Sequence, residues 1–150
     1  MSPTKSRYAA LCALPTCFPL IVKPRIGARS IGVHKVATKE ELLKAVARTP
    51  NAIIQEYLSD DNAEYTCSGF FYRGGSYGVL CGRRWLRNGD TYKSLFKRDP
   101  KLEAFVSDVG KKLDLFGPCN FQLRKTKRGP VIFEINCRFC GFNGGNVDSL

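Results

Sequence analysis

The nine residues VIFEINCRF, Val131 to Phe139, decide how the fold of this chain is interpreted. They predict a strand, and side chains alternate between the two faces of a strand. One predicted face carries Val131, Phe133, Ile135, Cys137 and Phe139, and the other carries Glu134, Asn136 and Arg138. An acid, an amide and a guanidinium in line indicate either the solvated outer face of an antiparallel strand or a binding site.

The preceding stretch, CNFQLRK, predicts the partner strand of a hairpin closed by TKRGP. If this loop has an odd length and is centred near Arg128, Gln122 lies opposite Glu134, and Asn120 lies opposite Asn136. Residues directly opposite each other in an antiparallel pair lie on the same face of the sheet. The predicted register therefore collects oxygen-bearing side chains on one face.

These oxygen-bearing side chains have the composition of a magnesium site. Mg²⁺ prefers one or two carboxylates together with amide oxygens, waters and substrate phosphates. Gln122, Glu134 and Asn136 supply that set without excess negative charge. Arg138 could hold a phosphate or an anionic intermediate through a bidentate contact. On the local pattern alone, the solvated-face interpretation remains the alternative.

The composition limits the classes of protein that fit. A chain of 150 residues with 43% hydrophobic residues buries a real core, which excludes disorder. The formal charge is +11, from 24 Lys and Arg against 13 Asp and Glu. This excess favours a polyanionic partner, whether nucleic acid, an acidic membrane surface or the phosphates of a nucleotide.

The seven cysteines, at positions 12, 17, 67, 81, 119, 137 and 140, follow no repeating spacing. An odd number scattered among apolar residues predicts reduced, packed thiols and a cytoplasmic location. Cys137 and Cys140 have the spacing of half a zinc site, but no second pair has that spacing and His34 is remote. No stretch approaches the roughly 20 uninterrupted apolar residues that span a bilayer, so we expect no membrane partner.

The remaining pattern predicts strands and helices in alternation. Thr38 and Glu41 form a capping box for a helix over residues 39–48. Asp99 and Pro100 start a second helix, whose apolar face is Leu102, Phe105, Val106, Val109 and Leu113. Further strands are expected at 19–24, 32–37 and 52–58, and a hairpin over 64–84 turns around Gly74 and Gly75, followed by a basic loop.

Lys23 ends the first predicted strand and precedes a loop that contains Gly27, Arg29, Ser30 and Gly32. Backbone N–H groups and a cation in such a loop can surround a phosphate chain. The loop is not a Walker A loop, because the order G-x-x-x-x-G-K-[ST] is absent. Taken singly, a glycine-containing connection between strands is ordinary.

Taken in order, these pieces resemble a known family. FPLIVKPRIGARSIGVHKVATKEELLKAV, AIIQEYLSDDNAEYT, GPCNFQL and VIFEINCRF resemble the ATP-grasp superfamily. The terminal Gln…Glu-x-Asn-x-Arg pattern is most similar to the carbamoyl phosphate synthetase large chain and related carboxylate-amine ligases. The resemblance implies an α+β fold of two lobes with antiparallel sheets. The small lobe and hinge would cover about 1–58, and the larger lobe about 59–150.

The resemblance also implies roles for single residues. Lys23 would contact the nucleotide phosphates, and the loop with Ser30 would cover them. The hinge Gln55, Glu56, Tyr57 and Leu58 would read the adenine edge through the backbone of Glu56 and Leu58. Glu64 would bind the ribose hydroxyls, and Arg84 a phosphate. The metal ligands would be Gln122, Glu134 and Asn136, and Arg138 would be the catalytic guanidinium near the transferred phosphoryl group.

The implied activity is an ATP-dependent carbon–nitrogen ligase that uses Mg²⁺, or Mn²⁺ in its place, to convert a carboxylate into an acyl phosphate. Its partners would be ATP and a carboxylate of unknown identity. Family members continue at both ends, so we expect this chain to be a truncated core. Its exposed surfaces could promote self-association. Whether the chain catalyses the reaction by itself is left open. The alternatives are a non-catalytic nucleotide-binding fragment and a basic nucleic-acid-binding module using residues 82–98, which leaves the other motifs unexplained.

Overall fold

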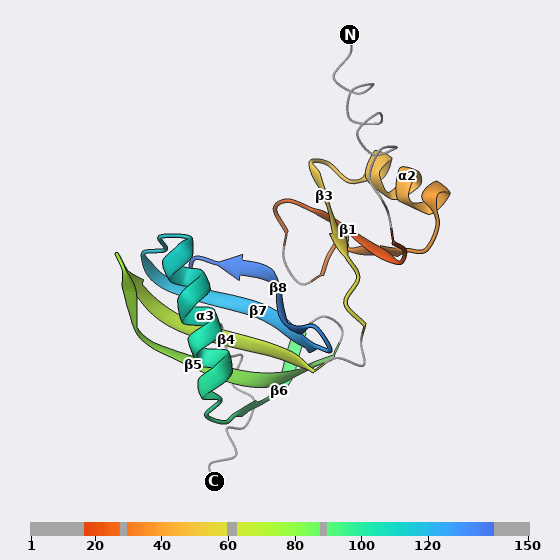
Figure 1. Ribbon diagram of the computed structural model, residues 1–150. Helices are drawn as coiled ribbons and strands as arrows, with labels where there is room; N and C mark the ends of the chain where they lie inside the picture. The colour runs from red at the N-terminus through yellow and green to blue at the C-terminus, as the bar shows by residue number, and fades with distance from the viewer. Residues whose placement is uncertain (1–16, 28–29, 60–62, 88–89, 140–150) are drawn as a thin grey trace. The chain divides into compact units, whose positions relative to one another are not determined.

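The computed structural model describes residues 17–27, 30–59, 63–87 and 90–139 (Figure 1). The chain divides into two compact units, Met1–Tyr57 and Leu58–Leu150. Each unit contains one antiparallel sheet and one helix among its described residues, which confirms the predicted α+β class. None of the helices in the described ranges combines the length and apolar character needed to cross a membrane.

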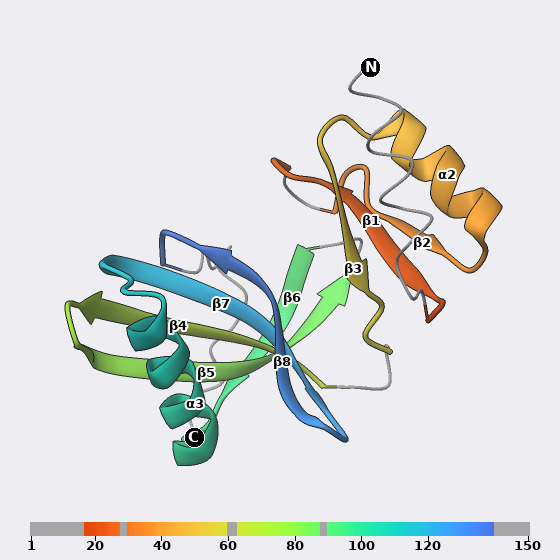
Figure 2. The same ribbon diagram turned by 45° about the horizontal axis from the view of Figure 1, so that its top comes forward.

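The first unit is a three-stranded antiparallel sheet covered by a helix. Its strands are β1 (Leu20–Pro24), β2 (His34–Val36) and β3 (Ala52–Glu56), in the order β2-β1-β3. Helix α2 (Lys39–Arg48) packs against β1 and β2 (Figure 2). The core between them is made of small and medium aliphatic side chains: Leu20, Val22, Val36, Leu42 and Ala45.

Helix α2 begins at the predicted cap. Thr38 Oγ1 accepts a hydrogen bond from the Glu41 N–H at 3.2 Å, which satisfies one of the unpaired amides of the first turn. Glu41 Oε2 accepts from the Ala37 N–H at 2.7 Å. The expected capping box is therefore closed one residue before the N-cap Thr38, and it fixes how the chain enters the helix.

Among its described residues, the second unit is a five-stranded antiparallel sheet with one helix on one face (Figure 1). The strand order is β6-β5-β4-β7-β8. The strands are β4 (Glu64–Tyr72), β5 (Gly75–Arg87), β6 (Asp90–Phe96), β7 (Gly117–Thr126) and β8 (Gly129–Asn136), and the helix is α3 (Pro100–Lys112). The buried core is Cys67, Phe71, Cys81, Leu102, Val106, Cys119, Phe121 and Leu123.

Helix α3 starts as predicted at Asp99, whose side chain accepts from the Leu102 N–H at 3.1 Å. Lys125 on β7 donates a hydrogen bond to the same carboxylate, and this contact, followed by the Leu102 amide, holds the pKa of Asp99 below its ordinary value. Leu102 and Val106 are buried, as expected. Leu113 is 54% exposed, so its assignment to the apolar face was wrong, because the helix ends at Lys112.

The predicted basic loop after the first hairpin is wrong, because these residues form paired strands. Strand β5 continues to Arg87 and β6 returns beside it, with Trp85 opposite Lys93. The Trp85 ring lies 4.9 Å from the Arg83 guanidinium carbon and 5.5 Å from Lys93 Nζ. Charged residues are common on exposed edge strands, where they discourage pairing with another chain, so their abundance did not indicate a loop.

Two of the cysteines correct the prediction that all thiols are reduced. Cys67 on β4 lies directly opposite Cys81 on β5, with Cα atoms 4.1 Å apart, and the two form a disulfide. Cys17, Cys119 and Cys137 are free, and burial raises the pKa of the Cys119 thiol. The two remaining cysteines, at positions 12 and 140, lie outside the described residues. A cytoplasmic location stays a prediction.

Helix α3 lies close to the sheet at Gly110, and this contact is testable. A Cβ atom at Gly110 would lie 2.1 Å from Cε1 of the buried Phe71 ring. We expect Gly110→Ala to lower the free energy of unfolding by about 2 kcal/mol, because overpacking exceeds the roughly 1 kcal/mol that alanine gains in a helix. Urea unfolding measures it. Gly78→Ala is the control, since no atom lies within 4 Å of its added Cβ, and equal stability of both variants would contradict the close approach.

Candidate functional site

The β7–β8 hairpin has the predicted pairing but reaches it differently. Gln122 lies opposite Glu134 and Asn120 lies opposite Asn136, as the sequence predicts. The loop, however, is not of odd length, because Thr126 pairs with Gly129 and leaves a two-residue turn. The register shifts by one residue between Gln122 and Leu123, where β8 carries an extra residue. This β-bulge, rather than the turn, places Glu134 opposite Gln122.

The bulge decides which side chains of β8 face the core. Leu123 lies opposite Ile132, and Phe121 lies opposite Ile135, so both isoleucines pack on the apolar core although they are three residues apart. Val131 lies opposite Arg124, so the predicted apolar face that began with Val131 is wrong there. With strict alternation from the turn, Glu134 would point into the core.

Arg138 does not share the strand face that the sequence predicts for it. Strand β8 ends at Asn136, and the Arg138 N–H donates to the Asn136 carbonyl at 2.8 Å, which turns the chain. Arg138 is exposed, and its Nη1 donates to the Phe139 carbonyl at 3.4 Å. A contact between Arg138 and a transferred phosphoryl group stays a prediction.

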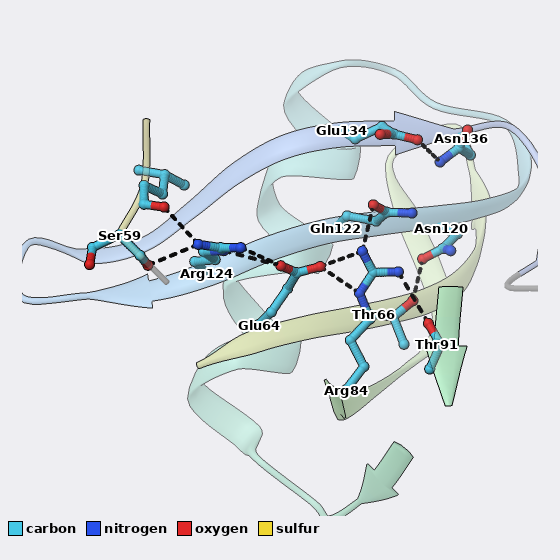
Figure 3. Close-up of polar contacts among 11 residues, drawn as sticks. Ser59, Glu64, Thr66, Arg84, Thr91, Asn120, Gln122, Arg124, Glu134 and Asn136 are labelled. Carbon is cyan, nitrogen blue, oxygen red and sulfur yellow. Dashed lines mark hydrogen bonds and ion pairs between the residues drawn. The ribbon is translucent and has the colours of Figure 1, made fainter. Parts of the chain in front are cut away.

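One carboxylate organises the polar face of the sheet (Figure 3). Tyr65 and Cys67 on β4 pack on the core, and Glu64 directly precedes Tyr65, so its side chain points to the opposite face of the sheet. Glu64 Oε1 accepts from Arg84, with Nε at 2.7 Å and Nη2 closer still. Glu64 Oε2 accepts from Arg124, with Nε at 3.1 Å and Nη2 at 2.8 Å. Four N–H donors therefore use the four acceptor positions of the carboxylate.

The two arginines carry this network in opposite directions along the face. Arg84 Nη2 also donates to Gln122 Oε1 at 2.9 Å, and Nη1 donates to Thr91 Oγ1 at 3.4 Å. Arg124 Nη1 donates to the carbonyls of Leu58 and Ser59, at 2.6 and 2.9 Å (Figure 3). Glu64 thereby links the chain segment that begins the second unit to the predicted metal ligand on β7.

This face is not a solvated strand surface at its centre. The side chains of Arg84, Arg124 and Glu64 are 12%, 16% and 9% exposed. Thr66 and Asn120 are buried and hydrogen-bond to each other at 2.8 Å. Buried ions need both their charge partners and their hydrogen bonds, and here both are present. The polar residues therefore form a built site.

Glu134 and Asn136 lie next to this network on β8 and are half-buried. Asn136 Nδ2 donates to Glu134 Oε1 at 2.8 Å, and Gln122 stands opposite Glu134 (Figure 3). Among the described residues, no group of three or more His, Cys, Asp and Glu lies together in a way that could hold a metal. One carboxylate with two amides nevertheless fits Mg²⁺, which takes its other ligands from water and phosphate.

The predicted site residues fall into the two units. Glu64, Arg84, Gln122, Glu134 and Asn136 belong to the second unit, which brings them to one face. In the first unit, Lys23 on β1 lies opposite Ile53, and Gln55 and Glu56 end β3. Tyr57 follows, with Lys35 Nζ 3.8 Å from its ring centre, and Ser30 has a positive φ of 58° in the β1–β2 loop.

Arg124 and Thr91 complete the network, and Thr66 and Asn120 form a separate buried pair on the same face. The sequence predicted no ligand role for these four residues. Strand alternation could have indicated two of them, because Arg124 lies two residues after Gln122, and Thr66 lies two residues after Glu64. The position of Thr91 was not predicted, because the residues of β6 were wrongly assigned to a loop. Asn120 was predicted opposite Asn136, which is confirmed, but its hydrogen bond with Thr66 was not predicted.

The comparisons with known proteins agree with this geometry. The ATP-grasp domain family matches residues 3–142. Because that match covers nearly the whole chain, the chain belongs to the ATP-grasp family. A search of the curated proteins found no significant match. The similarity to carbamoyl phosphate synthetase stays a prediction.

Solved structures of ligases share the fold. An L-amino acid ligase from Bacillus licheniformis superposes with a TM-score of 0.60 at 22% identity, over 85% of this chain and 34% of that one. The D-alanine–D-alanine ligase from Bacillus anthracis complexed with ATP gives 0.58 at 20%, over 91% and 45%. The Helicobacter pylori enzyme gives 0.60 at 22%, over 89% and 46%. The chain thus spans less than half of each structure.

The shared carboxylate predicts a large cost for its removal. We expect Glu64→Gln to lower the free energy of unfolding by about 3 kcal/mol, because two buried guanidinium groups lose their common counter-charge. Chemical denaturation measures it. The control is Glu103→Gln, whose partner Arg98 is 78% exposed, so that ion pair is screened by water and its loss costs less than about 1 kcal/mol. Similar losses in both variants would contradict the central position of Glu64.

Proposed function

We propose that this chain is the ATP- and magnesium-binding core of an ATP-dependent ligase that activates a carboxylate as an acyl phosphate. The observation that carries the proposal is the partly buried Glu64–Arg84–Gln122 network beside the Glu134–Asn136 pair, in a chain of the ATP-grasp family. A cationic and oxygen-rich face suits a polyphosphate with its metal. The Bacillus anthracis ligase, which shares the fold, is complexed with ATP, and this supports ATP as the nucleotide.

In this proposal, residues of the first unit contribute to the binding of the adenine base and of the phosphates. Lys23 contacts the phosphates, and the loop with Ser30 covers them. The hinge Gln55, Glu56, Tyr57 and Leu58 reads adenine through the backbone of Glu56 and Leu58. A contact between Glu64 and the ribose hydroxyls requires one of the two guanidinium groups to release an acceptor position, because all four are used in this conformation.

The second unit contributes the metal site and the phosphate cations. Glu134, Asn136 and Gln122 hold Mg²⁺, or Mn²⁺ in its place, which when bound neutralises charge on the phosphate oxygens. Arg84 lies against Gln122, so it places positive charge beside that site, and Arg138 supplies a second guanidinium. This chemistry is mainly positioning and charge neutralisation, so it needs no nucleophilic side chain from the chain.

The reaction proceeds in two displacements. A carboxylate oxygen attacks the γ-phosphorus, the bond from that phosphorus to the bridging oxygen of ADP breaks, and an acyl phosphate forms. An amine or other nucleophile then attacks the acyl carbon, loses a proton and releases phosphate. Binding without any turnover, measured by ADP release, would favour the alternative of a non-catalytic nucleotide-binding fragment.

Lys23 provides a test of the phosphate site. We expect Lys23→Ala to weaken ATP binding about tenfold, which corresponds to roughly 1.4 kcal/mol, because a cation beside the phosphates is removed. Isothermal titration in Mg²⁺ measures it. Lys44→Ala, on the exposed face of α2, removes the same charge elsewhere and should bind like the parent. Equal affinities of Lys23→Ala and the parent would remove Lys23 from the site.

Glu134 provides a test of the metal site. We expect Glu134→Gln to lose the part of the ATP-induced rise in melting temperature that depends on Mg²⁺, because the only carboxylate of the predicted ligand set becomes neutral. Thermal melts with ATP in Mg²⁺ and in EDTA separate that part. Asp108→Asn, exposed on α3, is the matched control. If Glu134→Gln kept the full magnesium-dependent rise in melting temperature, Glu134 would not be a metal ligand, and the solvated-face interpretation would hold for it.

A further inference from the structure

Arg124 makes contacts that the proposed function has not used. Its guanidinium reaches Glu64 with Nε and Nη2, at 3.1 and 2.8 Å, and reaches the carbonyls of Leu58 and Ser59 with Nη1, at 2.6 and 2.9 Å (Figure 3). Leu58 is buried. One side chain of β7 therefore fixes the backbone of the first two residues of the second unit.

These contacts depend on the shape of the guanidinium. The fork presents N–H groups in two directions, so it can hold a carboxylate on one side and two carbonyls on the other. The side chain is 16% exposed, which limits competition from water. A lysine at this position keeps the charge beside Glu64 but cannot reproduce both sets of contacts, so it separates charge from geometry.

We propose that Arg124 is a positioning residue that sets base recognition by the Leu58–Ser59 segment. The proposal rests on the proposed function, in which the backbone of Leu58 reads the adenine edge. When the protein backbone recognises a base, the backbone N–H and C=O groups must be held in one orientation. Arg84, on the other oxygen of Glu64, faces Gln122 instead. The Glu64 carboxylate therefore holds two arginines with different partners. Arg124 contacts the proposed base-binding segment, and Arg84 contacts the proposed metal ligand Gln122.

Comparing ATP with GTP isolates the base, because the two ligands share ribose, phosphates and metal. We expect Arg124→Lys to bind ATP about tenfold more weakly than the parent in Mg²⁺ and to bind GTP within about twofold of the parent, so the preference for ATP falls. Isothermal titration measures all four affinities. Arg98→Lys is the matched control, since Arg98 also pairs with a glutamate but lies on the surface, and its preference should be unchanged.

Each outcome decides the proposal. Equal weakening of ATP and GTP, or an unchanged preference, would overturn the role of Arg124 while leaving ATP binding intact. A parent that prefers neither nucleotide would overturn base recognition by this segment, and a parent that binds neither would overturn the proposed function itself. Arg124→Gln is the second variant. If neither Arg124 variant melts cooperatively, the residue holds the fold and the positioning role is wrong.

Chymotrypsin gives a readout that needs no nucleotide. It cleaves after aromatic residues, and Tyr57 directly precedes the segment that Arg124 holds. We expect faster cleavage after Tyr57 in Arg124→Lys than in the parent and in Arg98→Lys, because local opening of the chain exposes the bond. Unchanged cleavage would show that Arg124 does not restrain the segment, and the proposal would fall.

Discussion

The carboxylate of Glu64 between Arg84 and Arg124 is the interaction on which the second unit depends. It joins strands β4, β5 and β7 through side chains, in addition to the backbone ladder. Ions taken out of water are costly unless partners surround them, and each oxygen of Glu64 accepts from two N–H groups. The arginines outnumber the acid, so the cluster keeps an excess positive charge. That excess of positive charge suits a phosphate.

The sheet of the second unit separates two chemical environments. Its first face packs against α3 through aliphatic, aromatic and cysteine side chains, and Gly110 lets the helix backbone lie close to Phe71. Its second face carries the charged and amide side chains. A strand that alternates strictly gives this division directly, and β4 does so from Glu64 to Cys67. Packing of the apolar face against α3 thus holds the strands in place, and the strands in turn position the polar side chains on the opposite face.

Local signals in the sequence were enough to predict several of these features. Thr38 and Asp99 start helices because their side chains accept from first-turn amides that have no partner within the helix, which requires only neighbouring residues. The features that were missed depend on residues far apart in the chain. The contact of Cys67 with Cys81 follows from the register of a hairpin. The two roles of Arg124 need the fold to bring Leu58 and Glu64 beside it, and no local pattern indicates that meeting.

The extra residue at Phe133 has a consequence for how related chains are aligned. A bulge with a two-residue turn, and an unbulged hairpin with an odd-length loop, both bring Gln122 opposite Glu134. An insertion at one end of the hairpin can therefore be compensated by a deletion at the other. Gaps in this stretch carry little information about whether Gln122 and Glu134 remain opposite each other. Descent with changes of chain length can proceed here while the polar side chains keep their neighbours.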